Sequence, residues 1–144
     1  MVPDAPWAKE IRESWWFLLR MQSALHHGLH GGIYDSPRPT TADFESACYG
    51  LLLVQAYGAL ENALRHLRDD EVFPCRSSAL GHLMAASESR LPWINYAFVD
   101  QGRLYRNRLV HEMQTVRAFT VLEYVRAVQE ELKVWASLSI DELP

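Results

Sequence analysis

The chain has 144 residues, of which 49% are hydrophobic and 22% charged, and its formal net charge is −4. This length and composition predict one globular domain over residues 1–144, and the negative charge excludes a protein that is basic throughout. The two cysteines, Cys48 and Cys75, lack metal-binding or redox spacing. The sequence contains neither a signal peptide nor an apolar run of the ~20 residues that span a bilayer. We therefore expect a cytoplasmic protein without a membrane segment.

The first half of the chain predicts two long helices. Apolar side chains recur at helical spacing from Trp7, and the pattern ends near Gly28, before a Gly-Gly pair. A proline-rich loop over 34–39 follows, and Thr40 or Thr41 begins a second helix that runs to about Arg68. This second helix is the most apolar, so we expect it to be central. Its two glycines, Gly50 and Gly58, are predicted to allow close approach of a neighbouring helix.

The second half predicts shorter elements. A helix begins at Ser77 or Ser78 and ends near Ser89. The aromatic stretch 91–99 is expected either to pack in the core or an interface or to stack on bases. Asp100 caps a helix that runs to about Met113, and the capping-box sequence at 120–123 begins the last one. The sequence thus predicts an all-α protein, an up-down bundle of four to five helices.

Basic residues concentrate in the segment 101–117. It holds Arg103, Arg106, Arg108 and Arg117 against Glu112 alone. Residues four apart share one face of a helix, so Arg103, Asn107 and His111 form a polar column with Arg106 beside it. Arg106 and His111 lie roughly 140° apart around the helix. They are therefore expected to line two sides of a groove or to meet across a second copy of the chain.

These residue types suit cleavage of RNA by its own 2′-hydroxyl without a metal. That reaction needs a base, an acid and positive charge on the phosphorane. Histidine has the ordinary side-chain pKa nearest neutral pH, and arginine can donate two hydrogen bonds at once to phosphate oxygens. The segment has one histidine, so a two-fold dimer would supply the second. The alternative is that an Arg–His pair on an amphipathic helix is only surface decoration.

Arg106, Asn107 and His111 resemble the R-x4-6-H motif of the HEPN superfamily, in which asparagine often follows the arginine. The resemblance implies a helical bundle with the motif late in the chain. It also implies a metal-independent ribonuclease that forms homodimers, often as a toxin of a toxin–antitoxin pair or in phage defence. The subgroup paired with minimal nucleotidyltransferase antitoxins carries tyrosine two positions after the histidine. Here that position is Met113, so the resemblance does not extend to that pairing.

The resemblance assigns expected roles to the candidate residues. His111 would be the acid or base, Arg106 the cation on the phosphate, and Asn107 would hold the pair or the scissile phosphate. Arg103 and Arg108 would bind the RNA backbone. The expected partners are RNA, a second copy and an antitoxin protein, with no cofactor. The alternative function is a non-catalytic module that binds a nucleotide or a protein.

Two further groups bear on this site. Glu61 forms an i, i+4 pair with Arg65, and it is expected either to orient Arg106 or His111 or to face solvent. His26, His27 and His30 stand near the end of the first helix. We interpret them as helix-terminal side chains rather than metal ligands, and we expect no metal site.

Overall fold

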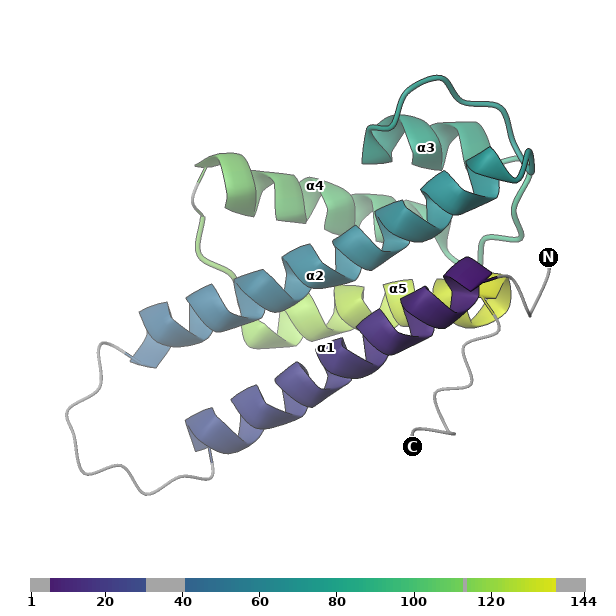
Figure 1. Ribbon diagram of the computed structural model, residues 1–144. Coiled ribbons are helices and arrows are strands. Elements are labelled where there is room, and N and C mark those ends of the chain that lie inside the picture. Colours follow the sequence, from purple (N-terminus) through teal and green to yellow (C-terminus); the bar gives the residue numbers. More distant parts are fainter. Residues whose placement is uncertain (1–5, 31–40, 113, 137–144) are drawn as a thin grey trace.

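The computed structural model describes residues 6–30, 41–112 and 114–136, and within them it contains five helices and no strand (Figure 1). The helices are α1 (Pro6–His30), α2 (Thr41–Asp69), α3 (Leu80–Ser87), α4 (Tyr96–Glu112) and α5 (Ala118–Ala136). Along the chain, α1, α2, α4 and α5 run in alternating directions (Figure 1). The predicted all-α up-down bundle is confirmed. None of the described helices has the length and apolarity needed to cross a membrane.

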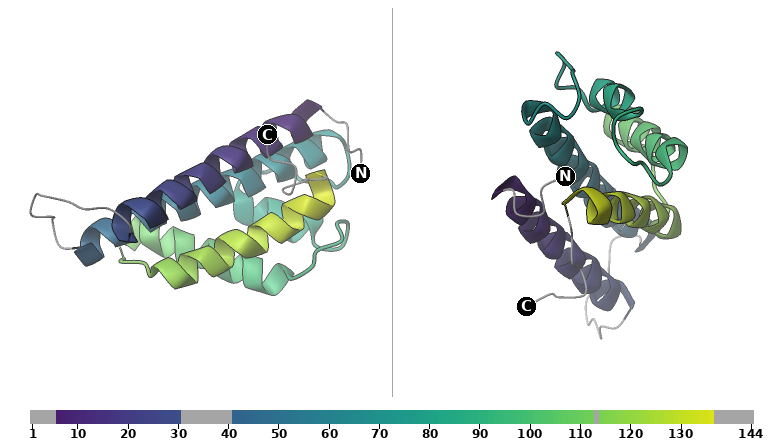
Figure 2. Two further views of the ribbon diagram at one scale, coloured as in Figure 1. Left: turned by 90° about the horizontal axis from the view of Figure 1, so that it is seen from below. Right: turned by 90° about the vertical axis from the view of Figure 1, so that its right-hand side faces the viewer.

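Helix α2 is the centre of the bundle, as its apolar sequence predicts. It contacts each of the other four helices, and α5 in addition contacts α1 and α4. The end-on view in Figure 2 shows α1 on one side of α2 and the α3–α4 pair on the other, with α5 filling the space between them. The short α3 lies at one end of the bundle, beside the last turns of α2 and the start of α4.

The core is a stripe of apolar side chains along α2, which includes the buried Leu53, Ala56 and Leu60. Phe44 and Leu51 are apolar residues of α2 that lie outside this stripe, and they are 49% and 62% exposed. Both lie roughly 180° around the helix from that stripe. A long helix can carry isolated apolar residues of this kind on its outer side.

Helix α4, which carries Arg106, Asn107 and His111, begins earlier than predicted. Its first residue is Tyr96, and the side chain of Asn95 caps it by accepting the Phe98 N–H at 3.3 Å. The predicted cap, Asp100, lies inside the helix, where its carboxylate accepts a hydrogen bond from Arg103 Nε at 2.7 Å. The final helix also begins early, at Ala118 rather than at Thr120.

A buried carboxylate from α5 completes the start of α4. Glu131 is 1% exposed, and it accepts the Ile94 N–H at 3.0 and 2.9 Å and the Asn95 N–H at 2.8 Å. Free amides and the positive end of a helix dipole both favour an anion at this position. Glu131 therefore ties the helix that carries the candidate motif to the last helix of the bundle.

Glycines set how closely α4 approaches the rest of the bundle. A Cβ atom on Gly102 would lie 1.9 Å from the Tyr57 hydroxyl oxygen and 2.6 Å from Tyr124 Cδ1, so only glycine fits. At Gly50 a Cβ would lie 3.0 Å from Leu109 Cδ2, which confirms the close approach predicted there. At Gly58 nothing lies within 4 Å, and the prediction of close packing there is wrong.

Candidate functional site

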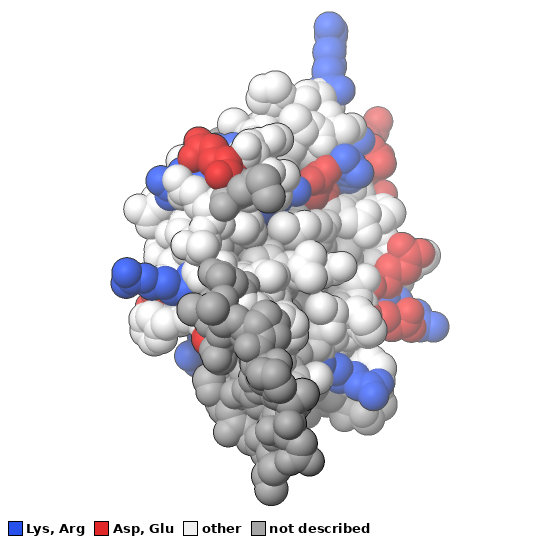
Figure 3. Space-filling view, turned by 90° about the vertical axis from the view of Figure 1, so that its left-hand side faces the viewer, with Lys and Arg blue, Asp and Glu red and all other residues white. Residues whose placement is uncertain are grey.

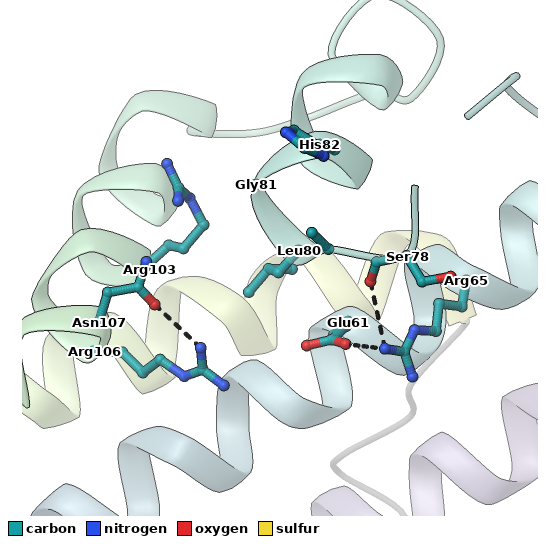
Figure 4. A pocket seen from close by; sticks show the side chains of 10 residues that line it. Glu61, Arg65, Ser78, Leu80, Gly81, His82, Arg103, Arg106 and Asn107 are labelled. Carbon is teal, nitrogen blue, oxygen red and sulfur yellow. Dashed lines mark hydrogen bonds and ion pairs between the residues drawn. The ribbon is translucent and has the colours of Figure 1, made fainter. Parts of the chain in front are cut away.

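Arg106 projects from the inner side of α4. It lines a pocket together with Glu61 and Arg65 of α2, so its side chain lies on the side of α4 that faces α2 (Figure 4). Its Nε atom is buried without a hydrogen-bond partner in the described part of the chain, while Nη1 donates to Asn107 Oδ1 at 3.1 Å. Arginine has five N–H donors. This guanidinium is therefore partly removed from water and has several donors left for a ligand.

The guanidinium lines a pocket of about 810 Å³ between α2, the start of α3 and α4 (Figure 4). The lining residues are Glu61, Arg65, Ser78, Ala79, Leu80, Gly81, His82, Arg103, Arg106 and Asn107. We call this cavity the arginine pocket. Three arginines and one glutamate line it, and Asp100 pairs with Arg103 from outside the lining, so one positive charge remains in excess. A cavity of this size and sign suits an anionic ligand.

The other two arginines of the pocket already have carboxylate partners. Arg103 Nε donates to Asp100, and its guanidinium rests against α3, where a Cβ on Gly81 would be 3.0 Å from Nη1. Arg65 forms the predicted pair with Glu61 and also donates to the Ser78 carbonyl at 3.4 Å. Figure 4 shows Glu61 and Arg65 on α2, across the cavity from the Arg103 and Arg106 side chains of α4. Within residues 6–30, 41–112 and 114–136, Arg106 is bound only to an amide oxygen, so it is the least neutralised of the three.

His111 lies apart from the arginine pocket. It is exposed in the last turn of α4 and is not among the lining residues. It shares the outer face of the helix with Arg108, which is exposed over the Tyr105 ring at 5.8 Å, and with Leu104, which is 48% exposed. The structure thus brings Arg103, Arg106 and Asn107 together with Glu61, and it places His111 and Arg108 on another face.

His82 is the pocket residue that the sequence did not single out. The chain between α2 and α3 folds back so that the first turn of α3 lies opposite Arg103 and Arg106 (Figure 4). No spacing in the sequence relates His82 to a helix that begins fourteen residues later. Arg65 was recognisable from its pairing with Glu61, but its place at the pocket depends on the same tertiary arrangement.

The aromatic stretch before α4 packs within the bundle. The Trp93 ring meets Trp135 edge-on at 4.4 Å and Tyr96 at 5.1 Å, and its Nε1 donates to Ser87 Oγ at 3.3 Å. These contacts match the predicted core packing rather than a platform for bases. Beneath α4, burial raises the pKa of the Tyr57 phenol far above its ordinary value of 10.0. Its hydroxyl therefore stays protonated and donates to the Val99 carbonyl at 2.7 Å.

Charge elsewhere on the surface is mixed. Figure 3 shows acidic and basic side chains interspersed on the end of the bundle that lies at the left of Figure 1. Among the described residues, no three His, Cys, Asp or Glu side chains gather where they would hold a metal ion. His26 and His27 meet edge-on at 5.8 Å, while the side chain of His30 lies outside the described residues.

Comparison of the chain with protein-family models, with curated proteins and with solved structures finds no match. The resemblance to the HEPN superfamily therefore depends on Arg106, Asn107 and His111, together with the order of the helices.

Proposed function

We propose that this chain is a metal-independent endoribonuclease of the HEPN type, which acts as a homodimer and binds an RNA phosphate in the arginine pocket. One observation carries the proposal. Arg106 of the motif lines a positively charged cavity with a buried Nε that has no partner within the described residues. The buried Nε shows that the guanidinium is partly removed from water, and its terminal N–H groups would donate to phosphate oxygens.

The remaining pocket residues support the same chemistry. A phosphodiester gains negative charge as it becomes a phosphorane, so fixed cations favour the transition state over the ground state. Arg106 would bind the scissile phosphate, with Asn107 held against its guanidinium to fix the geometry. Arg103, oriented by Asp100, would bind a neighbouring stretch of backbone.

A second copy would bring His111 to the site. In a two-fold dimer the same surface faces itself. An antiparallel contact of two α4 helices, centred between Asn107 and Arg108, sets His111 of one copy opposite Leu104 of the other, on the outer face of α4. From there the imidazole would have to reach past Leu104 to the edge of the pocket at Arg103. The half-exposed Leu104 and Val110 would provide apolar area for such a contact. His111 would then take the proton of the attacking 2′-hydroxyl.

The cleavage assay follows directly. We expect the purified chain to cleave single-stranded RNA in excess EDTA. Arg106→Ala should lower the rate by about 10²–10³-fold, as the loss of a transition-state donor does, and His111→Ala by about 10²–10⁴-fold. The matched control is Arg90→Ala, because Arg90 is exposed and outside the pocket lining. Equal rates for Arg106→Ala and Arg90→Ala would contradict the proposal.

A role in a toxin–antitoxin or phage-defence system belongs to the same proposal, with an antitoxin protein as partner. It predicts that expression of the wild type arrests growth and that expression of His111→Ala does not. Equal growth of both strains, with equal amounts of protein, would remove this part of the proposal.

The second candidate function is a non-catalytic module that binds a nucleotide or a protein. The position of His111 favours it, because a single chain has no motif histidine in the arginine pocket. The two functions differ in one measurement. A binding module retains RNA or nucleotide in an equilibrium assay that depends on Arg106, yet it leaves the RNA intact, whereas the ribonuclease shortens it.

A further inference from the structure

The arginine pocket contains an imidazole of its own. His82 lies in the first half of α3 and lines the cavity together with Arg103, Arg106 and Asn107. Its ring is exposed, and Nδ1 lies 2.8 Å from Ser77 Oγ. With Nδ1 engaged by the serine, Nε2 is the ring nitrogen left for a ligand in the pocket.

Ser77 is held firmly, so it orients the ring. Arg68 Nη1 donates to the Ser77 carbonyl at 3.0 Å and to Ser78 Oγ at 3.0 Å, which ties this loop to α2. The Ala79 N–H donates to Ser77 Oγ at 3.1 Å. A serine hydroxyl has one proton to donate and two lone pairs. Ser77 Oγ can therefore donate to a neutral Nδ1 or accept from a protonated one while it keeps the bond from Ala79.

This arrangement suits a residue that exchanges protons. The imidazole keeps its hydrogen bond to Ser77 in both protonation states, so the ring need not turn when it gains or loses a proton. Next to it, the guanidinium of Arg103 rests against Gly81, the residue before His82. Figure 4 shows His82 on α3, across from the Arg103 and Arg106 side chains of α4, with Arg106 below Arg103. With the scissile phosphate on Arg106 and the adjacent backbone on Arg103, the leaving 5′ oxygen would lie toward the side of the pocket that His82 borders.

We propose that His82 is a catalytic residue of the arginine pocket, the general acid that protonates the leaving 5′ oxygen of the RNA. This inference rests on the proposed ribonuclease function. In the step, a bond forms between the 2′ oxygen and phosphorus and the bond between phosphorus and the 5′ oxygen breaks. The 2′-hydroxyl proton passes to His111 of the second copy, and the imidazolium of His82 gives its Nε2 proton to the 5′ oxygen. The products are a 2′,3′-cyclic phosphate and a 5′-hydroxyl.

The assignment divides the work between the two copies. One chain provides the cations and the acid, and its partner provides only the base. A reaction with one base and one acid has a bell-shaped pH profile. We expect His82→Ala to abolish the fall in kcat/KM at high pH and His111→Ala to abolish the fall at low pH. A residue with only a structural role would lower the whole profile without changing its shape.

The test combines a binding readout with a kinetic one. Nitrogen-resolved NMR of the histidine rings of the full chain is followed over pH, with and without uridine 3′-monophosphate as the probe. We expect the nucleotide to move the His82 ring resonances toward those of the imidazolium and to leave the His27 resonances in place, because a phosphate dianion favours the imidazolium. His82→Ala should slow RNA cleavage by about 10²–10⁴-fold. His27→Ala is the matched control, since His27 is an exposed histidine of α1 outside the pocket lining.

Each outcome separates the two proposals. A shifted His82 resonance together with slow cleavage by His82→Ala is the expected result. If wild type and His82→Ala cleave RNA equally fast, the acid role is overturned while the ribonuclease stands. A wild type that cleaves no RNA, but whose His82 still responds to the nucleotide, overturns the ribonuclease and the acid role and leaves a phosphate site. A His82 resonance that ignores the nucleotide overturns the inference without relying on any variant that must fold.

Discussion

Replacement of Glu131 by glutamine tests how α4 is held. The carboxylate receives two backbone N–H groups at the start of the helix, from Ile94 and Asn95. Glutamine keeps one acceptor oxygen, and its NH₂ group faces an amide that also donates. Hydrogen bonds to a charged group contribute about 1.5–3 kcal/mol each. The substitution removes about one such bond and weakens the other.

The cost of burying a charged group changes the free energy of unfolding in the opposite direction. Burial of a carboxylate costs more than burial of a neutral amide, so glutamine recovers part of the loss. Glu131 is almost fully buried but has its donors in place, so we expect the lost hydrogen bond to dominate. The free energy of unfolding should fall by about 2 kcal/mol. For a chain of this size that lowers Tm by roughly 6–8 °C.

Urea and thermal unfolding followed by circular dichroism measure both quantities. The matched control is the neighbouring Glu130→Gln, because Glu130 is half-exposed and its only described ion pair is with Lys133 at 3.3 Å. That substitution should change stability by less than about 0.5 kcal/mol. The reasoning would be refuted if the two variants were equally stable, because the Glu131 carboxylate would then contribute nothing to the start of α4.

Three further predictions concern the packing of α4 and its neighbours. Gly102→Ala should gain about 1 kcal/mol of helix propensity but lose more through the clash of its Cβ with Tyr57 and Tyr124. Urea unfolding should therefore show a net loss of stability of at least about 1 kcal/mol. A more stable variant would contradict the close approach of α4 at this position. Because burial raises the pKa of Tyr57, its contribution to stability is fully present below its ordinary value of 10.0 and is lost as pH rises toward the folded value. Unfolding free energies at pH 8 and pH 10.5 should therefore differ less in Tyr57→Phe than in the wild type, and an unchanged difference would contradict this. Ser46→Ala should lower the free energy of unfolding by about 1–3 kcal/mol in the same assay, because the buried Ser46 hydroxyl accepts the Val116 N–H at 2.8 Å. A neutral effect would show that water replaces the hydroxyl as the acceptor.

The order and type of the helices were predictable because they depend on local signals. Apolar spacing marks α1 and α2, and glycine, proline and serine mark their ends. The start of α4 was predicted too late, at Gln101, because part of what stabilises its first turn is distant in sequence. Glu131 lies 37 residues beyond Ile94. A carboxylate that caps a helix from another element leaves no pattern near that helix.

The candidate site was predictable only in part, for a similar reason. The helical spacing placed Arg103 and Asn107 on one face, and both line the arginine pocket. The same spacing grouped His111 with them. Side chains four residues apart are offset by about 40° around the helix axis, and over two such steps from Arg103 this offset brings His111 onto the outer face. His82 reaches the pocket through the fold of the α2–α3 connection. No periodicity within α4 reports on that connection.

The most direct test of the central claim mixes two inactive variants. Arg106→Ala and His111→Ala are unfolded together, refolded together and assayed on RNA in EDTA. If each site takes its arginine from one copy and its histidine from the other, half of the dimers are mixed, and each of these has one intact site. Cleavage should return to about a quarter of the wild-type rate. A mixture as inactive as its two components, beside an active wild type, would contradict a site shared between copies.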